Sequence, residues 1–365
     1  MNPRASPVDV RYRRERVQAT CPVCCSPRAH LLWMATSSQA AQHFVLREFD
    51  AARFSELASC IEGLWGGTSS AVVRCEVCGF CHSQPFIAGD ARFYQLAFGD
   101  VGGYPASRWE FQLTRDVLAG RDHSRHSLLE IGAGAGAFIR GIVDDIIPRR
   151  NITCTEYSAY GQNQLREMGV KCLSVDVRDM SDRDYADGFD FVCMFQVLEH
   201  MDRLDDLFEK LRSLMKKGGS LFVSVPNPRL IEFNELNGAL LDMPPNHLGR
   251  WNRECFEAIS ERYGFSVEDH RIEEFDPVAM TAQFINYRFM QQAQQEGSLE
   301  NRISTMRSQR LRGRMRRLGL AWTAATAKPA LRRMTSEMGN SQWVKLVNAT
   351  QSGATNVGLG EHPLR

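Results

Sequence analysis

The middle of the chain alternates between two patterns of apolar and polar residues. Short β-rich apolar runs lie within residues 127–132, 152–158, 171–177, 189–200, 220–228 and 265–275. Between them are amphipathic segments with apolar residues three or four positions apart, at 137–147, 161–169, 202–219 and 252–264. Strand-like runs that alternate with helical segments predict an α/β domain with a mostly parallel sheet.

The pattern changes after residue 278. Residues 279–338 have a helical pattern and are rich in Gln and Arg, and only SQWVKLVNA at 341–349 again resembles a strand. We therefore expect a seven-stranded sheet with helices on both faces, and a helical insertion before its last strand. The predicted parts are a cysteine-bearing unit at 1–95, the α/β core at 96–277, a basic helical insertion or lid at 278–340, the last core strand at 341–350 and a flexible tail at 351–365.

Composition excludes several protein classes. The chain has 365 residues, 44 basic and 43 acidic side chains and 43% hydrophobic residues, as expected of a soluble globular protein. The first residues, MNPRASPVDVRYRRER, lack the apolar core of a secretory signal, and no apolar run reaches the roughly 18 residues of a membrane span. We expect a cytoplasmic protein, in which the 11 cysteines serve metal binding where they pair as CxxC, rather than disulfides.

The segment LLEIGAGAGAF at 128–138 places glycine at every second position between a predicted strand and a predicted helix. A bare backbone at such a turn approaches a ligand closely and presents helix N-terminal amides to it. Gly132, Gly134 and Ala137 satisfy the dinucleotide pattern GxGxxA, and the acid Glu156 follows about 20 residues later. These residues alone leave NAD and S-adenosylmethionine as candidate cofactors.

Three further features lie at fixed places relative to this turn. Glu130 precedes the first glycine by two residues, and Gly136 extends the loop to ExGxGxG. The predicted fourth strand ends in VLEH, and KKGG precedes a strand that ends in VPN. In this order and spacing the sequence resembles the class I S-adenosylmethionine-dependent methyltransferases over about residues 105–275 and 341–349. The resemblance implies a Rossmann-like sheet and S-adenosylmethionine as the cofactor.

The resemblance also implies a role for individual residues in holding that cofactor. The implied contacts are Glu130, Gly132, Gly134 and Gly136 around the methionine part, Glu156 to both ribose hydroxyls, Tyr157 and Val177 against the adenine, Asp176 to the adenine amino group, and Phe195 with Gln196 closing the pocket. A carboxylate suits the ribose position because it offers only hydrogen-bond acceptors.

Two CxxC pairs lie in the N-terminal unit. They are CPVC, with Cys21 and Cys24, and CEVC, with Cys75 and Cys78. Two such pairs predict one closed four-thiolate Zn²⁺ site with a structural role, because four protein ligands leave no open position. Residues 30–70 must then fold outside the two pairs. Further candidate ligands are Cys25, Cys81 and His82.

This N-terminal unit followed by the α/β core resembles a group of bacterial methyltransferases with an N-terminal zinc-binding domain. That group is met in sugar, polysaccharide and natural-product pathways, which implies a sugar, glycan or other small-molecule acceptor methylated at oxygen. The link at 91–111 supports the resemblance, as does the loop LLDMPPNHLGRWN at 240–252, which is similar to the group's PPHH loop. Asn246 stands in place of the first histidine of that loop.

Methyl transfer from a sulfonium is an in-line displacement, so an enzyme mainly has to align donor and acceptor. The carboxyl edge of the predicted sheet gathers His200, Asn227 and His247 as candidate catalytic residues. A neutral imidazole can take a hydroxyl proton at physiological pH. We favour His247 as the base; helix capping is the alternative for His200, and turn formation is the alternative for Asn227.

The insertion carries 10 basic residues and no acidic residue between positions 301 and 333. Leu311, Met315, Leu318, Leu320 and Trp322 are interleaved with them. Such a stretch suits an anionic membrane surface, a nucleic acid, a lid over an anionic glycan or lipid-linked acceptor, or a solvated helix packed by its apolar residues. Of the functional readings, we favour the lid.

Together these features predict a zinc-stabilised, S-adenosylmethionine-dependent O-methyltransferase. Three alternatives remain open. They are an RNA methyltransferase whose basic insertion follows the phosphates, an NAD(P)-dependent oxidoreductase, and a non-catalytic scaffold.

Overall fold

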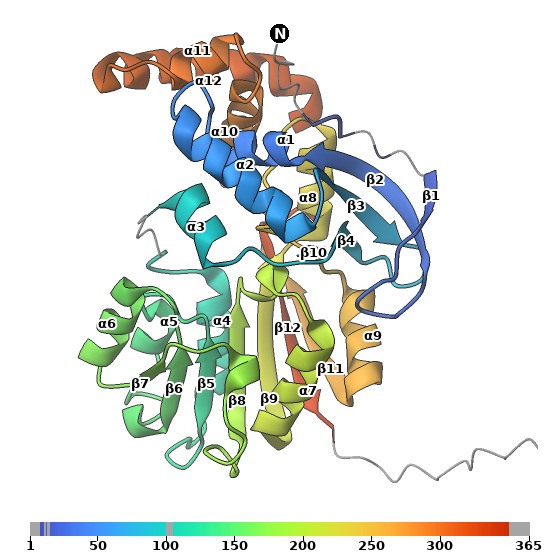
Figure 1. The fold of residues 1–365 in the computed structure, drawn as a ribbon. Helices are drawn as coiled ribbons and strands as arrows, with labels where there is room; N and C mark the ends of the chain where they lie inside the picture. The colour runs from blue at the N-terminus through green and yellow to red at the C-terminus, as the bar shows by residue number, and fades with distance from the viewer. Residues whose placement is uncertain (1–7, 11, 13–14, 100–104, 350–365) are drawn as a thin grey trace, which may run out of the picture.

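A computed structural model describes residues 8–10, 12, 15–99 and 105–349, and in that part of the chain seven strands form the larger sheet (Figure 1). Their order is β11 (Phe265–Ile272), β12 (Ser341–Asn348), β9 (Met215–Pro226), β8 (Phe189–Phe195), β5 (Leu128–Ile131), β6 (Ile152–Thr155) and β7 (Lys171–Leu173). The strands from β9 to β7 are parallel, whereas β12 is antiparallel to β9 and β11. The predicted mixed α/β fold with a seven-stranded sheet is confirmed.

Alternate residues of the central strands pack on different layers of helices. Leu129 and Leu221 belong to the core that is shared with α7 (Leu204–Leu214) and α9 (Arg253–Tyr263). Leu128 and Phe222 face the opposite layer, formed by α4 (Trp109–Leu118), α5 (Ala137–Arg140) and α6 (Ala159–Glu167). Because both faces are covered, the strands are almost continuously apolar, as parallel strands in α/β folds are.

A second sheet is antiparallel throughout and belongs largely to the N-terminal unit. Its order is β1 (Glu15–Gln18), β2 (Arg28–Thr36), β3 (Ser69–Cys75), β4 (Cys81–Gln84) and β10 (Gly249–Arg250). The helices α1 (Ser37–Phe44), α2 (Ala51–Trp65) and α3 (Ala91–Phe98) supply much of the apolar core beside it. β10 comes from the α/β core, so a boundary at residue 95 leaves out one strand of this sheet.

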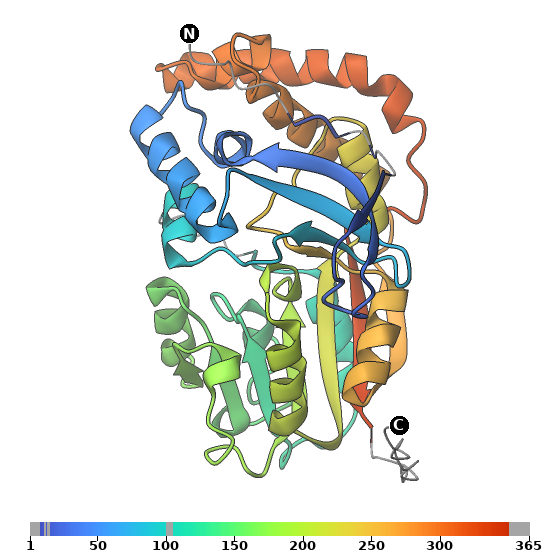
Figure 2. The same ribbon diagram turned by 45° about the vertical axis from the view of Figure 1, so that its right-hand side comes forward.

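The insertion forms α10 (Pro277–Ala293), α11 (Leu299–Ser304) and α12 (Gln309–Leu331). Both ribbon views place α11 and α12 beyond the N-terminal unit, on the side away from the larger sheet (Figures 1 and 2). α12 is buried through small residues, namely Gly319, Thr323, Ala327 and Ala330. The interleaved Leu311, Leu318 and Trp322 are exposed instead, so these large apolar residues do not pack the helix on the protein.

Several predicted helices have different bounds. The helix expected at 137–147 ends at Arg140, and Asp144 in the following turns has a left-handed backbone with φ of 60°. The helix expected at 202–219 ends at Leu214, because the KKGG segment belongs to the long strand β9. The sequence prediction also missed α8 (Pro228–Leu236), although Asn227 as N-cap with proline at the first helical position is a recognised start signal.

The remaining short elements are three 3₁₀ turns, η1 (Arg149–Asn151), η2 (Val177–Asp179) and η3 (Leu198–His200). Within the described ranges, no helix is long and apolar enough to cross a membrane. The predicted tail at 351–365, residues 1–7 of the predicted N-terminal unit and residues 100–104 of the link lie outside the described residues.

Candidate active site and metal centre

The glycine loop lies between β5 and α5, at the carboxyl edge of the larger sheet. Gly132, Gly134 and Gly136 all have left-handed backbones, with φ of 68°, 56° and 73°. A Cβ atom on Gly132 would lie 2.6 Å from the Val197 side chain, so the loop needs glycine there for space as well as conformation. The structure therefore brings this loop against the end of β8.

Glu156 follows β6 and anchors the loop. Its Oε2 accepts a 2.8 Å hydrogen bond from the Gly134 amide, and its Oε1 accepts a 2.8 Å hydrogen bond from the Ser158 amide. Each carboxylate oxygen can accept a second hydrogen bond. The predicted role toward ribose hydroxyls is compatible with these two backbone contacts.

Glu130 lies at the base of the same loop and is only 3% exposed. Its Oε2 has no hydrogen-bond partner among the described residues. Burial, reinforced by the nearby Glu156 carboxylate, holds the pKa of Glu130 well above its usual range. A buried acceptor without a donor fits a site completed by a donor group on a ligand, such as the amino group of a bound amino-acid moiety.

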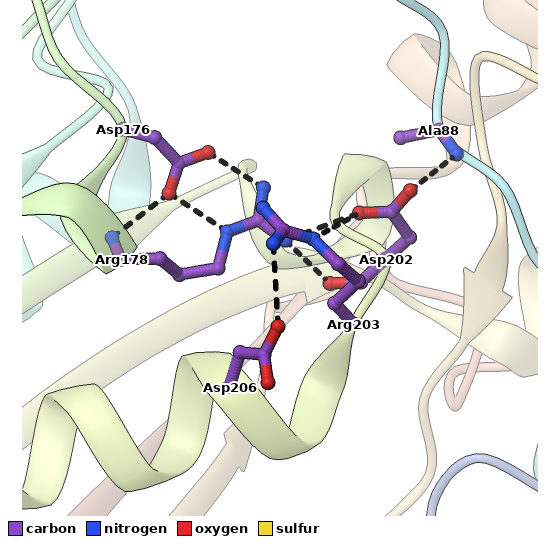
Figure 3. A network of polar contacts seen from close by, with 6 residues as sticks. All are labelled: Ala88, Asp176, Arg178, Asp202, Arg203 and Asp206. Carbon is purple, nitrogen blue, oxygen red and sulfur yellow. Dashed lines mark hydrogen bonds and ion pairs between the residues drawn. The ribbon is translucent and has the colours of Figure 1, made fainter.

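Asp176, after β7, is held in place by Arg178 (Figure 3). The Arg178 guanidinium donates to both Asp176 carboxylate oxygens, at 2.8 and 2.6 Å, and also reaches Asp202 at 3.1 Å. Asp202 in turn accepts a 3.0 Å hydrogen bond from the Ala88 amide of the N-terminal unit. This network orients the carboxylate that was predicted to bind adenine. It also lowers the pKa of Asp176, against the opposing effect of burial.

The other predicted adenine contacts differ in exposure. Tyr157 is 68% exposed, which leaves its ring available to a ligand, and partial burial with the neighbouring Asp176 raises its pKa to about 12. Val177 is buried in the apolar core. Phe195, which was predicted to close the pocket rather than to contact the adenine, packs against Phe111 and Phe138 at the end of β8.

Gln196 follows β8 directly and has a left-handed backbone, with φ of 57°. Its side-chain amide donates to Glu110 Oε1 at 3.3 Å and to Ser224 Oγ at 3.4 Å. These contacts fix the turn that leads from β8 into η3.

His200 and His247 lie together, with ring centroids 4.7 Å apart at 74°. The Nδ1 atom of His200 bonds the Asn246 carbonyl oxygen at 2.7 Å, and Nδ1 of His247 bonds Asp242 Oδ1 at 2.5 Å. Burial together with His247 lowers the pKa of His200 to about 3. For His247, burial acts to lower the pKa, but the Asp242 carboxylate outweighs it and raises the pKa.

Sequence reasoning did not single out Glu199 and Asp242, which complete this cluster. Glu199 is 2% exposed, and burial raises its pKa to about 7. The available signals were the acid beside His200 in LEH and the acid five residues before His247.

Asn227, the third predicted catalytic residue, is engaged elsewhere. Its side-chain amide donates to the carbonyl oxygens of Glu337 and Gly339, both at 2.8 Å, and its Oδ1 caps α8. These contacts tie β9 to the segment before β12.

The four predicted zinc ligands converge at the turns that connect β1 to β2 and β3 to β4. Their ligand atoms lie within 4.8 Å of one another, with Sγ separations of 3.6 Å for Cys21 and Cys78 and 3.5 Å for Cys24 and Cys75. Four thiolates on a tetrahedral Zn²⁺, with Zn–S bonds of about 2.3 Å, lie about 3.8 Å apart. The donor set and spacing therefore fit Zn²⁺.

The further candidates are not members of this cluster. Cys25 is exposed, Cys81 accepts a hydrogen bond from Arg74, and His82 is buried with Nδ1 near the Ser83 carbonyl oxygen. The cluster docks on the α/β core, since the Asn252 amide donates to the Cys78 carbonyl oxygen and Arg262 donates to the Val23 carbonyl oxygen.

Residues 108–270 match the family model described as "Methyltransferase domain". This stretch is therefore similar in sequence to methyltransferase domains. It contains the glycine loop, Glu156, Asp176 and the cluster around His247. The N-terminal cysteine unit and the insertion lie outside the matched residues.

Comparison with solved structures gives further similar chains. A phosphoethanolamine N-methyltransferase 2 from Haemonchus contortus, in complex with phosphomonomethylethanolamine and S-adenosylhomocysteine, is 18% identical, and the match covers 70% of this chain and 56% of that one with a TM-score of 0.41. A cyclopropane synthase from Mycobacterium tuberculosis is 15% identical, and the match covers 65% of this chain and 82% of that one with a TM-score of 0.41. No curated protein matches the sequence.

Proposed function

We propose that this protein transfers a methyl group from S-adenosylmethionine to a hydroxyl oxygen of a sugar, glycan or other small-molecule acceptor. The observation that carries the proposal is the buried Oε2 of Glu130, which has no hydrogen-bond partner among the described residues and lies beneath three left-handed glycines, within the stretch that matches the methyltransferase model. In this arrangement Glu130 would accept from the amino group of the cofactor's methionine part. Glu156 would accept from the ribose hydroxyls, and Asp176 from the adenine amino group.

The acceptor would bind beside His247. Bound S-adenosylmethionine would supply a methyl group on a sulfonium sulfur for transfer to the acceptor oxygen, and Nε2 of His247 would accept the proton that the acceptor hydroxyl loses. Asp242, bonded to Nδ1 of the same ring, would stabilise the imidazolium that forms. His200 would support the acceptor side of the site through its contact with the His247 ring.

The four-cysteine cluster would hold a structural Zn²⁺. Three of its cysteines are buried, and the unit contacts α9 directly. A filled tetrahedral site keeps the chain segments near 21–24 and 75–78 together without taking part in methyl transfer.

The insertion would contact an anionic partner through α12, and in place of the lid that we favoured from the sequence we favour an anionic membrane that carries a lipid-linked acceptor. Leu311, Leu318 and Trp322 are exposed on this helix among exposed arginines, which is the composition of an interfacial helix. α10, rather than α12, borders the loop around His247, because Gln291 of α10 accepts a hydrogen bond from the Leu240 amide. RNA is the competing partner, and binding to it would fall steeply with salt.

The first test is calorimetric titration of the protein with S-adenosylmethionine, S-adenosylhomocysteine and NAD, beside Glu156→Ala. We expect the adenosyl ligands to bind, the variant to bind at least tenfold more weakly, and NAD to give no heat. Binding of NAD alone would favour an oxidoreductase, and absence of all binding would favour a scaffold. If the adenosyl ligands bind, sugar acceptors are screened for S-adenosylhomocysteine release.

A further inference from the structure

A second group of metal-ligand atoms lies away from the cysteines. Glu199, His200 and His247 each offer one ligand atom, and these atoms lie within 4.8 Å of one another. Glu199 Oε1 is 3.9 Å from His200 Nε2, and the two imidazole rings are 4.7 Å apart. A first-row metal ion with bonds of about 2.1 Å needs its ligand atoms about 3 Å apart, which small side-chain rotations would achieve.

The hydrogen bonds of both histidines engage Nδ1 and leave Nε2 as the ring nitrogen for a metal ion. A carbonyl oxygen only accepts, so the contact with Asn246 requires a proton on Nδ1 of His200. The Asp242 carboxylate likewise requires a proton on Nδ1 of His247. In each neutral ring Nε2 therefore carries the lone pair. Metal-binding histidines typically donate their other ring N–H to a carbonyl or carboxylate in this way.

Glu199 supplies the third ligand atom, and its burial is an independent indication of a bound cation. Its side chain is 2% exposed, and Oε2 has no hydrogen-bond partner among the described residues. A buried carboxylate oxygen without a donor is costly, and a bound cation removes that cost. In the described part of the chain, no Arg or Lys side chain forms an ion pair with Glu199 within 4.0 Å, and its neighbour within that distance is His200.

We infer that Glu199, His200 and His247 bind one divalent first-row transition metal ion, with Asp242 as the residue that positions His247. Two imidazoles and one carboxylate suit Mn²⁺, Fe²⁺, Co²⁺ or Zn²⁺ and leave coordination positions open. Binding of the ion does not depend on the proposed function.

The role of the ion does rest on the proposed function. An open position would take the acceptor hydroxyl oxygen and lower its pKa, as a metal ion does for bound water. The O–CH₃ bond would then form, the S–CH₃ bond would break with its electron pair going to sulfur, and the hydroxyl proton would leave to solvent. In that case His247 is a ligand and no longer the proton acceptor.

The test uses the full chain with Zn²⁺ loaded at the cysteine cluster. Mn²⁺ is titrated into this protein, and electron paramagnetic resonance measures how much Mn²⁺ is bound. We expect one bound Mn²⁺ per chain. Glu199→Gln and His247→Gln should each weaken binding at least tenfold, and Asp242→Asn by up to about 100-fold. Glu257→Gln, on the exposed face of α9, is the control and should leave Mn²⁺ binding unchanged.

Co²⁺ absorption serves as the second probe, and S-adenosylmethionine titration of Glu199→Gln reports whether that variant is folded. The inference would be overturned if the wild-type protein bound neither Mn²⁺ nor Co²⁺. So would unchanged affinity in both Glu199→Gln and His247→Gln. If the metal binds as expected but no adenosyl ligand does, the metal site stands and the methyltransferase proposal falls.

Discussion

Gly161 in α6 lies so close to Gly134 that a Cβ atom on it would be 2.5 Å from the Gly134 carbonyl oxygen. The same atom would be 2.7 Å from Cγ of Glu156. The first turn of α6 thus supports the glycine loop and the acid that anchors it.

Gly161→Ala should therefore displace the loop. We expect S-adenosylmethionine affinity measured by calorimetry to fall about tenfold or more, because a contact this short forces backbone to move. Gly313→Ala is the matched control, since Gly313 is also helical and has nothing within 4 Å of its Cβ position. The control should bind normally and be stabilised by roughly 0.5–1 kcal/mol. Normal binding by Gly161→Ala would show that the loop does not hold the cofactor.

Arg178→Met should weaken cofactor binding without touching the cofactor. The substitution removes the two hydrogen bonds that orient the Asp176 carboxylate and the link to Asp202. Hydrogen bonds to charged groups contribute about 1.5–3 kcal/mol each, so partial loss of orientation should weaken binding about tenfold. Arg166→Met, on the exposed face of α6, is the control in the same titration. Equal affinities for the two variants would remove Asp176 from the adenine site.

The neighbours Cys24 and Cys25 offer a matched test of the zinc site. Cys24 belongs to the four-thiolate cluster, whereas Cys25 is exposed and lies outside it. Cys24→Ser should lose zinc, measured by mass spectrometry of the metal content, and should melt at a lower temperature. Cys25→Ser should retain one zinc per chain and the wild-type melting temperature. Zinc retained in Cys24→Ser would disprove the predicted ligand set.

His43 should make the protein sensitive to acid. Burial lowers its pKa to about 4 from 6.5, so the unfolded chain binds the proton more readily than the folded one. Stability from this residue is complete above about pH 6.5 and is lost as the pH falls toward 4, by at most about 3 kcal/mol. His43→Gln should flatten the fall in melting temperature across that range. An unchanged pH dependence in the variant would assign the acid sensitivity to other groups.

The exposed face of α12 should bind anionic membranes. Trp322 is 61% exposed, so its fluorescence should shift to shorter wavelength on vesicles that contain phosphatidylglycerol and stay unchanged on phosphatidylcholine. Leu318→Ser should weaken binding, whereas Val278→Ser, which changes an exposed apolar residue on α10, should have no effect. Binding to RNA without binding to vesicles would favour the RNA alternative.

The positions of the strands along the chain could be predicted because each strand carries its own apolar run, and SQWVKLVNA marks β12 despite the long insertion before it. Helix ends were less predictable. Met215–Gly219 reads as the end of a helix, but tertiary pairing with neighbouring strands draws it into β9. Local propensity does not contain that information.

The candidate site likewise has a part that the sequence predicts and a part that it does not. Glu130, Glu156 and the four paired cysteines stand in spacings that indicate their chemistry. The Glu199, His200 and Asp242 grouping around His247 depends on how the loop at 240–252 folds back over η3, with the Leu248 amide donating to the Glu199 carbonyl oxygen. No local pattern gives that contact.

The two-residue strand β10 pairs with Cys81 and His82. The loop that carries His247 therefore continues directly into a strand of the N-terminal sheet. A chimera that exchanges only residues 1–95 with a relative would replace β4 but keep the original β10. The edge strand of the new sheet would then come from a different protein than the strand it pairs with. An exchange of segments that keeps this sheet intact must move the loop at 240–252 and the N-terminal unit together, although about 150 residues separate them in the sequence.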